Sequence, residues 1–255
     1  MPLDIRLVPL LSDNYAYLLH DSDSGEAAVV DPSEAGPVLA ALQETGWQLK
    51  HILNTHHHHD HIGGNAELKR ATGAHIAGPE KDRHRIPDLE TGLSEGDTYR
   101  VGTRTLRVLE VPGHTSGHIA LVFDEDQAVF SGDTLFALGC GRLFEGSPAQ
   151  MWQSLQKLRA LPGATRVYCG HEYTQSNARF AVTIEPENAE LTARAAEIAT
   201  LRAAGQPTIP STIDLENRTN PFLRPDRPEL QAAQGWTGRD TVEIFAEIRG
   251  LKDKF

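Results

Sequence analysis

Five of the twelve histidines of this chain stand in one short run, His56 to His61, which is interrupted only by Asp60. Imidazole is the commonest metal ligand in proteins, and a carboxylate suits the same divalent ions. In extended backbone, residues two apart point the same way, so His56 and His58 can bind one ion. Asp60 and His61 come where the chain should turn into a helix, and both can point toward a second ion. The run therefore predicts a metal centre.

Three further candidate ligands follow the same rule of placement. Four apolar runs each end at a residue that can bind a metal, namely His56, His114, Asp133 and His171. Because loops that leave the ends of buried strands meet at one rim of a fold, we expect these side chains to converge. A solvated histidine-rich loop that binds metal adventitiously is the alternative that composition alone would suggest. Four ligands at four strand ends argue against it.

The full candidate set is larger than one ion needs. A single zinc ion takes about four ligands, or three and a water in a catalytic site, so the set suits two ions that share one carboxylate. Asp133 is the natural bridge. The set of seven is His56, His58 and His114 for one ion, Asp60, His61 and His171 for the other, and Asp133 for both. Two such ions would lower the pKa of a bound water from about 16 toward about 7 and supply hydroxide at neutral pH.

Composition narrows the classes of partner. The chain has 255 residues, of which 39% are hydrophobic, and a net charge of −11. That charge argues against a nucleic-acid partner, because phosphate contacts need a basic face. No apolar run approaches the 18 or so residues of a membrane span, and the first residues lack the pattern of a signal peptide. With only two cysteines we expect a reducing compartment, the cytoplasm, and no membrane partner.

Hydrophobic patterning predicts the strands and helices that must position the ligands. Strands and helices alternate as far as residue 172, after which the chain becomes helical, so we place a catalytic domain at residues 1–172 and a helical domain at 173–255. We expect irregular backbone at 82–97 and a proline-punctuated loop at 206–227. The expected elements are strands at 5–10, 15–20, 27–31, 51–54, 74–77, 104–111, 118–123, 127–131 and 166–169, and helices at 37–46, 65–73, 151–161, 188–204 and 239–253.

The motifs T-H-x-H-x-D-H, P-G-H-T, G-D-T and G-H, in this order, resemble the metallo-β-lactamase superfamily. The likeness covers residues 1–172 and implies an α/β fold, the αββα sandwich, with a metal site. It does not specify the substrate, because the superfamily includes lactamases, thioester hydrolases, nucleases, lactonases and oxidoreductases.

Further segments extend the likeness over the whole chain, to the glyoxalase II (hydroxyacylglutathione hydrolase) family. They are GDTLF at 132–136, GCGR at 139–142, CGHEYT at 169–174, NPFLR at 220–224 and RGLKDKF at 249–255. The resemblance implies hydrolysis of S-D-lactoylglutathione to D-lactate and glutathione, the second step of methylglyoxal detoxification. It implies that Arg249 and Lys252 bind the glutathione carboxylate end, with Arg142, Phe144 and Tyr173 lining the groove. Family members carry Lys in place of Arg142 and Tyr in place of Phe144.

The expected mechanism follows from the two ions. Hydroxide held between them attacks the thioester carbonyl, and Asp60 steers it or accepts its proton. A thiolate leaves readily, so no strong general acid is needed. We expect two divalent ions, zinc first with iron or manganese also suited, and a monomer. Two rivals remain open: a persulfide dioxygenase with one iron, and a non-catalytic metal-binding protein.

Four other residues have two readings each. His118 is expected to be a core histidine or one that supports a ligand, rather than an eighth ligand. Asp31 ends a strand beside the expected site, where it either hydrogen-bonds a ligand or serves a plain turn. Cys140 and Cys169 are expected to be small buried side chains rather than ligands.

Overall fold

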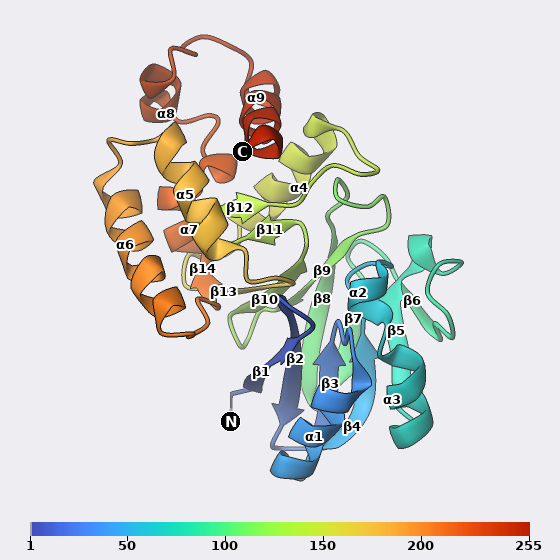
Figure 1. Cartoon of the computed structure of the whole chain (residues 1–255). Coiled ribbons are helices and arrows are strands. Elements are labelled where there is room, and N and C mark those ends of the chain that lie inside the picture. The colour runs from blue at the N-terminus through green and yellow to red at the C-terminus, as the bar shows by residue number, and fades with distance from the viewer. Residues whose placement is uncertain (1) are drawn as a thin grey trace. The chain divides into compact units, whose positions relative to one another are not determined.

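The computed structural model describes residues 2–255, and these divide into two compact units (Figure 1). The first unit comprises the chain as far as Glu110 together with Ser116–Gly132. The second comprises Val111–Thr115 and Asp133–Phe255. The chain thus passes between the units at three covalent junctions, and each unit is described in turn.

The first unit begins with a six-stranded sheet in the order β1-β2-β3-β4-β5-β6. Its first three strands pair antiparallel, and β3 to β6 pair parallel. The bounds are β1 (Asp4–Leu10), β2 (Asn14–Asp21), β3 (Glu26–Val30), α1 (Ala35–Thr45), β4 (Gln48–Leu53), α2 (His59–Ile62), α3 (Asn65–Thr72), β5 (His75–Pro79), η1 (Glu80–Asp82) and β6 (Thr91–Leu93).

Helices α1 and α3 cover one face of this sheet (Figure 1). Val38 of α1 and Leu68 of α3 are buried with Leu18 of β2 and Ile52 of β4 in one apolar cluster. Each helix ends at a glycine in the left-handed conformation, Gly46 after α1 and Gly73 after α3, with φ of 72° and 73°. Glycine adopts this conformation without a Cβ penalty, and the helix ends predicted at residues 46 and 73 are confirmed to within one residue.

The remaining strands of the first unit form an antiparallel meander. They are β7 (Thr98–Val101), β8 (Arg104–Glu110), β9 (Ile119–Phe123) and β10 (Ala128–Gly132), each paired with the next. This meander faces the first sheet: Tyr17 of β2 packs on Phe130 of β10 with ring centroids 5.4 Å apart. Both sheets bury one side against the other, which is the expected sandwich.

The second unit is mainly helical. Its elements are β11 (Leu135–Phe136), β12 (Gly139–Cys140), α4 (Pro148–Arg159), β13 (Arg166–Cys169), α5 (Thr174–Ile184), α6 (Ala189–Ala203), β14 (Ser211–Thr212), α7 (Ile213–Thr219), η2 (Pro221–Leu223), α8 (Pro228–Ala233) and α9 (Thr241–Lys254). Helix α4 begins earlier than the predicted residue 151. Ser147 and Gln150 form a reciprocal capping box there, with Pro148 in the first turn.

Two sequence predictions about irregular segments are wrong. Residues 82–97 contain β6, which pairs with β5 and is too short to show alternation. Residues 206–227 contain β14, α7 and η2. Helix α7 forms because Thr212 caps it, accepting a hydrogen bond from the amide of Leu215, and because Ile213 is buried. The prolines at 210 and 221 flank this helix rather than break it.

The compact units do not divide at the predicted domain boundary near residue 172. Residues 133–172 group with the helices that follow them, partly because α4 packs on α9: the Trp152 and Phe245 rings lie 6.1 Å apart. Among residues 2–255, no helix is both long enough and apolar enough to cross a membrane.

Candidate metal centre

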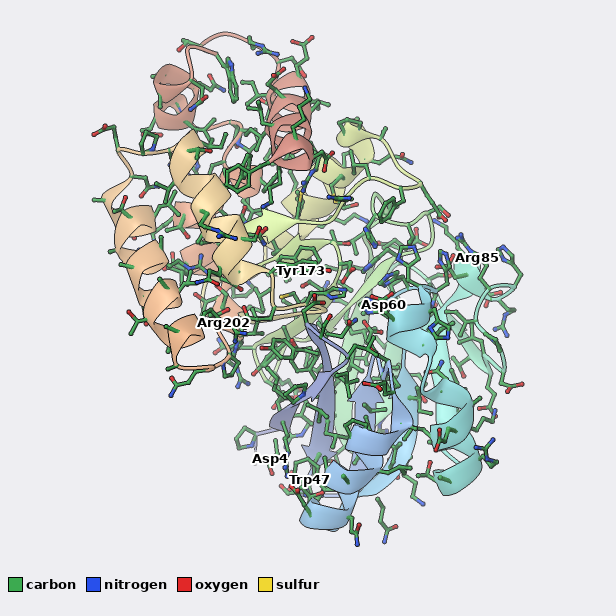
Figure 2. All side chains as sticks on the ribbon, viewed as in Figure 1. Asp4, Trp47, Asp60, Arg85, Tyr173 and Arg202 are labelled. Atoms are coloured by element: carbon green, nitrogen blue, oxygen red, sulfur yellow. The ribbon has the colours of Figure 1, made fainter. Side chains whose placement is uncertain are left out.

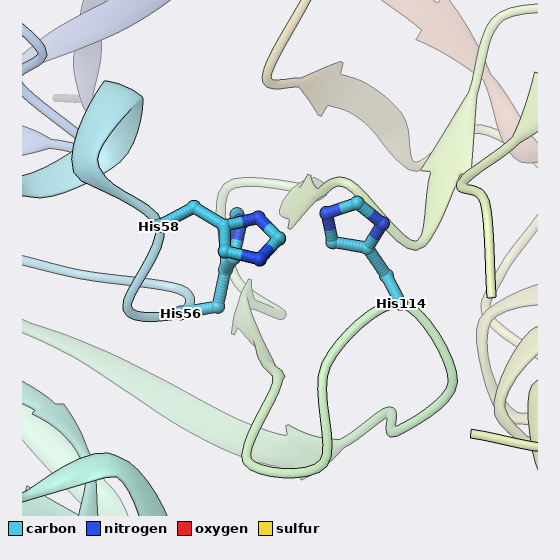
Figure 3. A group of neighbouring side chains, drawn as sticks. All are labelled: His56, His58 and His114. Carbon is cyan, nitrogen blue, oxygen red and sulfur yellow. The ribbon is translucent and has the colours of Figure 1, made fainter. Parts of the chain in front are cut away.

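The first unit gathers its four predicted ligands in the segment after β4. His56 is completely buried, and its ring centroid lies 4.7 Å from that of His58 and 4.2 Å from that of His61. Figure 3 shows His56 and His58 on this segment, immediately before helix α2. Asp60 is half-exposed, with its Oδ2 atom 3.6 Å from the Nε2 atom of His61. The segment therefore brings four ligand side chains of the predicted set together.

Asp31 orients two of these histidines. It directly follows β3 and has φ of +49°, a conformation that costs a non-glycine residue energy. Its buried carboxylate accepts the amide of Thr55 at 2.8 Å, the hydroxyl of Thr55 at 2.6 Å and Nδ1–H of His61 at 3.0 Å. Because the Thr55 hydroxyl gives its proton to Asp31, its oxygen accepts Nδ1–H of His56, 3.0 Å away.

The consequence is a fixed tautomer for both rings. With Nδ1 protonated in His56 and His61, each presents the lone pair of Nε2 as its ligand atom. One ligand atom from each of Asp31, His56 and His61 can be chosen so that all three lie within 4.8 Å of one another. Of the two readings of Asp31, the structure shows the hydrogen bond to His61, whose role as a metal ligand stays a prediction.

The other histidines of the run face elsewhere. His57 donates Nδ1–H to Asp82 at 3.0 Å, and its Nε2 lies 3.2 Å from Nη1 of Arg85, so both ring nitrogens are engaged with protein groups. His59 is exposed on α2. Outside the run, His118 is buried, and its ring stacks on that of His56 with centroids 4.6 Å apart, as expected of a core histidine.

The second unit gathers the remaining three ligands. The Oδ2 atom of Asp133 lies 3.5 Å from Nε2 of His114 and 3.2 Å from Nε2 of His171. Two ligands bound at about 2.1 Å to one tetrahedral ion stand about 3.4 Å apart, so both distances suit shared ions. His114 donates Nδ1–H to the carbonyl of Arg142 at 2.9 Å, which again leaves Nε2 for a metal. One oxygen between two imidazoles suits the bridging role that is predicted for Asp133.

Two of these ligands are close in sequence to residues of the first unit. His114 is two residues from Ser116, and Asp133 follows Gly132 directly. Thr134 donates a hydrogen bond to the carbonyl of Val111 at 3.0 Å and so ties the two segments together.

A cluster of cations lies on the second unit, in a chain whose net charge is −11. Burial, followed by the nearby Arg249, Arg179 and Arg142, lowers the pKa of Lys252 to about 8. Its ammonium group donates to the carbonyl and hydroxyl oxygens of Ser176 at 3.3 and 3.2 Å. Several cations held close without equal negative charge form a site prepared for an anion.

Arg249, which the family resemblance assigns to substrate binding, is a buried side chain with partners inside the protein. It is 5% exposed, and it donates to the carbonyl of Cys140 at 2.8 Å and pairs with Asp253 at 3.0 Å. Its guanidinium also lies over the ring of Phe222, 5.0 Å from the centroid. It therefore anchors α9 from inside the unit, and its contact with a substrate stays a prediction.

Two exposed rings border the imidazoles of this unit that are predicted to bind metal. Tyr173, which Figure 2 labels, stacks on His171 with centroids 4.7 Å apart and planes 4° apart. Phe144 is 63% exposed and lies 5.2 Å from His114. Exposed aromatic surface beside metal ligands suits contact with an organic substrate.

Sequence reasoning missed several supporting residues. Asn14 donates to the carbonyl oxygen of Asp60 at 2.9 Å and to its carboxylate at 3.2 Å, and Ser33 donates to the same carbonyl. No motif marks them. Both cysteines are buried, as predicted, and burial raises the pKa of the Cys140 thiol to about 11 and that of Cys169 to about 12.

Comparison with known sequences extends over the whole chain. Residues 11–171 match the metallo-beta-lactamase superfamily, and residues 172–255 match the family described as the hydroxyacylglutathione hydrolase C-terminus. The chain is 58% identical over 253 residues to a hydroxyacylglutathione hydrolase of Methylococcus capsulatus, covering 99% of both chains.

Two solved structures carry the same fold. ETHE1 from Myxococcus xanthus is 26% identical, with a TM-score of 0.70, covering 98% of this chain and 90% of its own. TTHA1623 in a di-iron-bound form is 29% identical, with a TM-score of 0.61, covering 86% of this chain and all of its own. The predicted metallo-β-lactamase fold, with a helical C-terminal part, is confirmed.

Proposed function

Since the chain belongs to the metallo-beta-lactamase superfamily and, within it, to the hydroxyacylglutathione hydrolases, we propose that it hydrolyses S-D-lactoylglutathione and related 2-hydroxyacyl thioesters of glutathione. The products are D-lactate, or the corresponding hydroxy acid, and glutathione. The observation that carries the proposal is the match of the whole chain to this family, and it is supported by the predicted metal ligands and a cation cluster in one acidic chain.

Two divalent ions are proposed to bind between the seven ligands. His56, His58 and His114, drawn in Figure 3, would hold the first ion, Asp60, His61 and His171 would hold the second, and Asp133 would serve both. The donor set fits the ions, because buried hydrogen bonds fix Nδ1–H on three of the imidazoles. The di-iron form of the related TTHA1623 supports two ions. Zinc is the first candidate, and iron and manganese suit the same ligands.

When bound, such a pair of ions supplies hydroxide at neutral pH and polarises a carbonyl group. The residues of the chain orient what reacts. Asn14 and Ser33 hold Asp60 in place, so its carboxylate can accept the proton of the attacking water. The leaving group is a thiolate, which departs without a strong acid.

Substrate binding is assigned to the second unit. Glutathione carries two carboxylates, and Lys252 and Arg142 supply cations to bind them. The buried Arg249 adds a third positive charge near Lys252. Phe144 and Tyr173 offer apolar surface beside the metal ligands. We propose residues 1–172 as the catalytic domain and 173–255 as the substrate-binding domain.

Two free buried cysteines suit a reducing compartment, which supports the cytoplasm as the location. Action as a monomer stays a prediction, which light scattering on the purified protein would test.

The direct test compares two thioesters with metal-loaded protein. S-D-lactoylglutathione should be hydrolysed efficiently, and the D-lactoyl thioester of N-acetylcysteamine, which lacks both glutathione carboxylates, should show a much higher KM. Absence of hydrolysis of the first substrate by protein carrying its metals would overturn the proposal. Equal KM values for the two thioesters would be consistent with a thioesterase, but they would contradict recognition of glutathione.

A further inference from the structure

A buried carboxylate that binds none of the predicted metal ligands lies beneath the histidine run. Asp82, at the end of η1, is completely buried. One of its oxygens accepts Nδ1–H of His57 at 3.0 Å, and the other accepts an N–H of Arg85. Arg85 closes the triangle, since its Nη1 lies 3.2 Å from Nε2 of His57. A carboxylate out of water persists only when paired in this way.

The same cluster reaches a second segment of the chain. Nη2 of Arg85 donates to the hydroxyl of Ser116 at 3.0 Å. Gly117 lies directly against Asp82, and a Cβ at this position would stand 2.3 to 2.7 Å from the carboxylate atoms. Only glycine permits this approach. Asp82 and Arg85 therefore contact two segments at once: the one containing His57, and the one containing Ser116 and Gly117.

Each of these segments carries predicted ligands of the first ion. His57 stands between His56 and His58, and Ser116 is two residues from His114. We propose that His57, Asp82, Arg85 and Ser116 form a brace, here called the Asp82 brace, that sets the spacing of the first ion's ligands. Its members are positioning residues, and the inference rests on the proposed two-ion centre.

The chemistry of the brace makes it intolerant of small changes. His57 must give Nδ1–H to Asp82 while its Nε2 accepts from Arg85, which fixes one tautomer and one ring orientation. Removing the guanidinium takes one hydrogen-bond partner from the buried Asp82 carboxylate and one from Nε2 of His57. We expect the backbone of the histidine run to shift as these groups seek new partners.

The test isolates each ion by removing a ligand of the other. In a His171→Ala background the first ion's set is intact, and in a His58→Ala background the second ion's set is intact. Adding Arg85→Ala should weaken Zn²⁺ binding about 10- to 100-fold in the first background and less than about threefold in the second. The dissociation constant is measured by competition with a chromophoric chelator. Arg83→Ala is the matched control, because Arg83 pairs with exposed Glu80 on the same turn.

A second variant approaches the brace from the other segment. Gly117→Ala pushes a methyl group into Asp82 and should give the same selective loss. Gly36→Ala, where a Cβ meets nothing within 4 Å, is its control. If Arg85→Ala does not fold, as judged by circular dichroism of the metal-free protein, Gly117→Ala decides. Affinities within threefold of the controls, or equal losses in both backgrounds, would overturn the brace. Hydrolysis is not measured, so failure of the proposed function would be seen separately.

Discussion

Lys252→Met is the perturbation that most cleanly removes a charge from the proposed glutathione site. Lys252 is half-buried on α9, with its ammonium against Ser176 and 5.4 Å and 5.1 Å from the ring centroids of Phe180 and Phe255. Methionine has an apolar stem of similar length and removes the ammonium group, so the fold should persist. Arg249 is less suitable, because its removal would leave Asp253 without its partner at 3.0 Å.

The expected size follows from the contacts of the ammonium group. A hydrogen bond to a charged group contributes about 1.5–3 kcal/mol. Lys252 already donates to Ser176 and would exchange part of that bonding for a substrate carboxylate, so the lower half of the range applies. About 1.5–2 kcal/mol corresponds to a KM about 10- to 30-fold higher. The kcat should fall much less, because Lys252 is not assigned to the reacting atoms.

The pH dependence gives an independent check. Burial and the neighbouring Arg249, Arg179 and Arg142 lower the pKa of Lys252 to about 8, so the cation is present below pH 8 and is lost above it. The ratio of wild-type to Lys252→Met kcat/KM should be constant below about pH 7 and fall toward one above pH 8. Taking the ratio cancels the substrate's own titration.

The assay is steady-state hydrolysis of S-D-lactoylglutathione from pH 6 to 9.5, with Lys254→Met as the control from the exposed end of the same helix. The control should retain the wild-type KM. An unchanged KM for Lys252→Met, or a ratio that does not vary with pH, would refute the assignment of Lys252 to the substrate anion.

The remaining predictions concern the supports of the site and the fold. Asp31→Asn should weaken metal binding about 10- to 100-fold, seen by chelator competition, because an amide cannot accept all three of its hydrogen bonds; wild-type affinity would contradict this. Arg194→Met should lower the free energy of unfolding by about 3 kcal/mol in urea denaturation, because it removes the cation that is paired with the buried Glu216 carboxylate. A decrease in unfolding free energy of less than about 1 kcal/mol would show that the Arg194–Glu216 ion pair is not needed for stability. Cys140 and Cys169 should resist thiol reagents at pH 8 until the protein unfolds, since burial raises their pKa values to about 11 and about 12. Rapid labelling of the native protein would contradict their burial.

The sequence predicted best where strand ends and ligand types coincide. His56 after β4, Asp133 after β10 and His171 after β13 stand as expected, because apolar runs locate buried strands and the polar residue beyond each run lies at its end. Within each unit, the ligands that the unit contributes lie together. That all seven close on two ions stays a prediction.

Side chains whose role depends on distant partners could not be predicted. Asp82 lies in a stretch expected to be irregular, and its burial depends on contact with His57 and Gly117, distant in sequence. The orientation of Arg249 into the unit likewise depends on Cys140, 109 residues earlier. Helix α7 was missed because the two flanking prolines suggested a loop, whereas a capping threonine and a buried isoleucine stabilise it.

Metal content measured alongside hydrolysis tests the central claim most directly. Protein stripped with a chelator and reloaded with zinc in steps should bind two ions per chain, and hydrolysis of S-D-lactoylglutathione should reach its full rate only as the second ion binds. Full activity at one ion per chain, or in metal-free protein, would contradict the two-ion account.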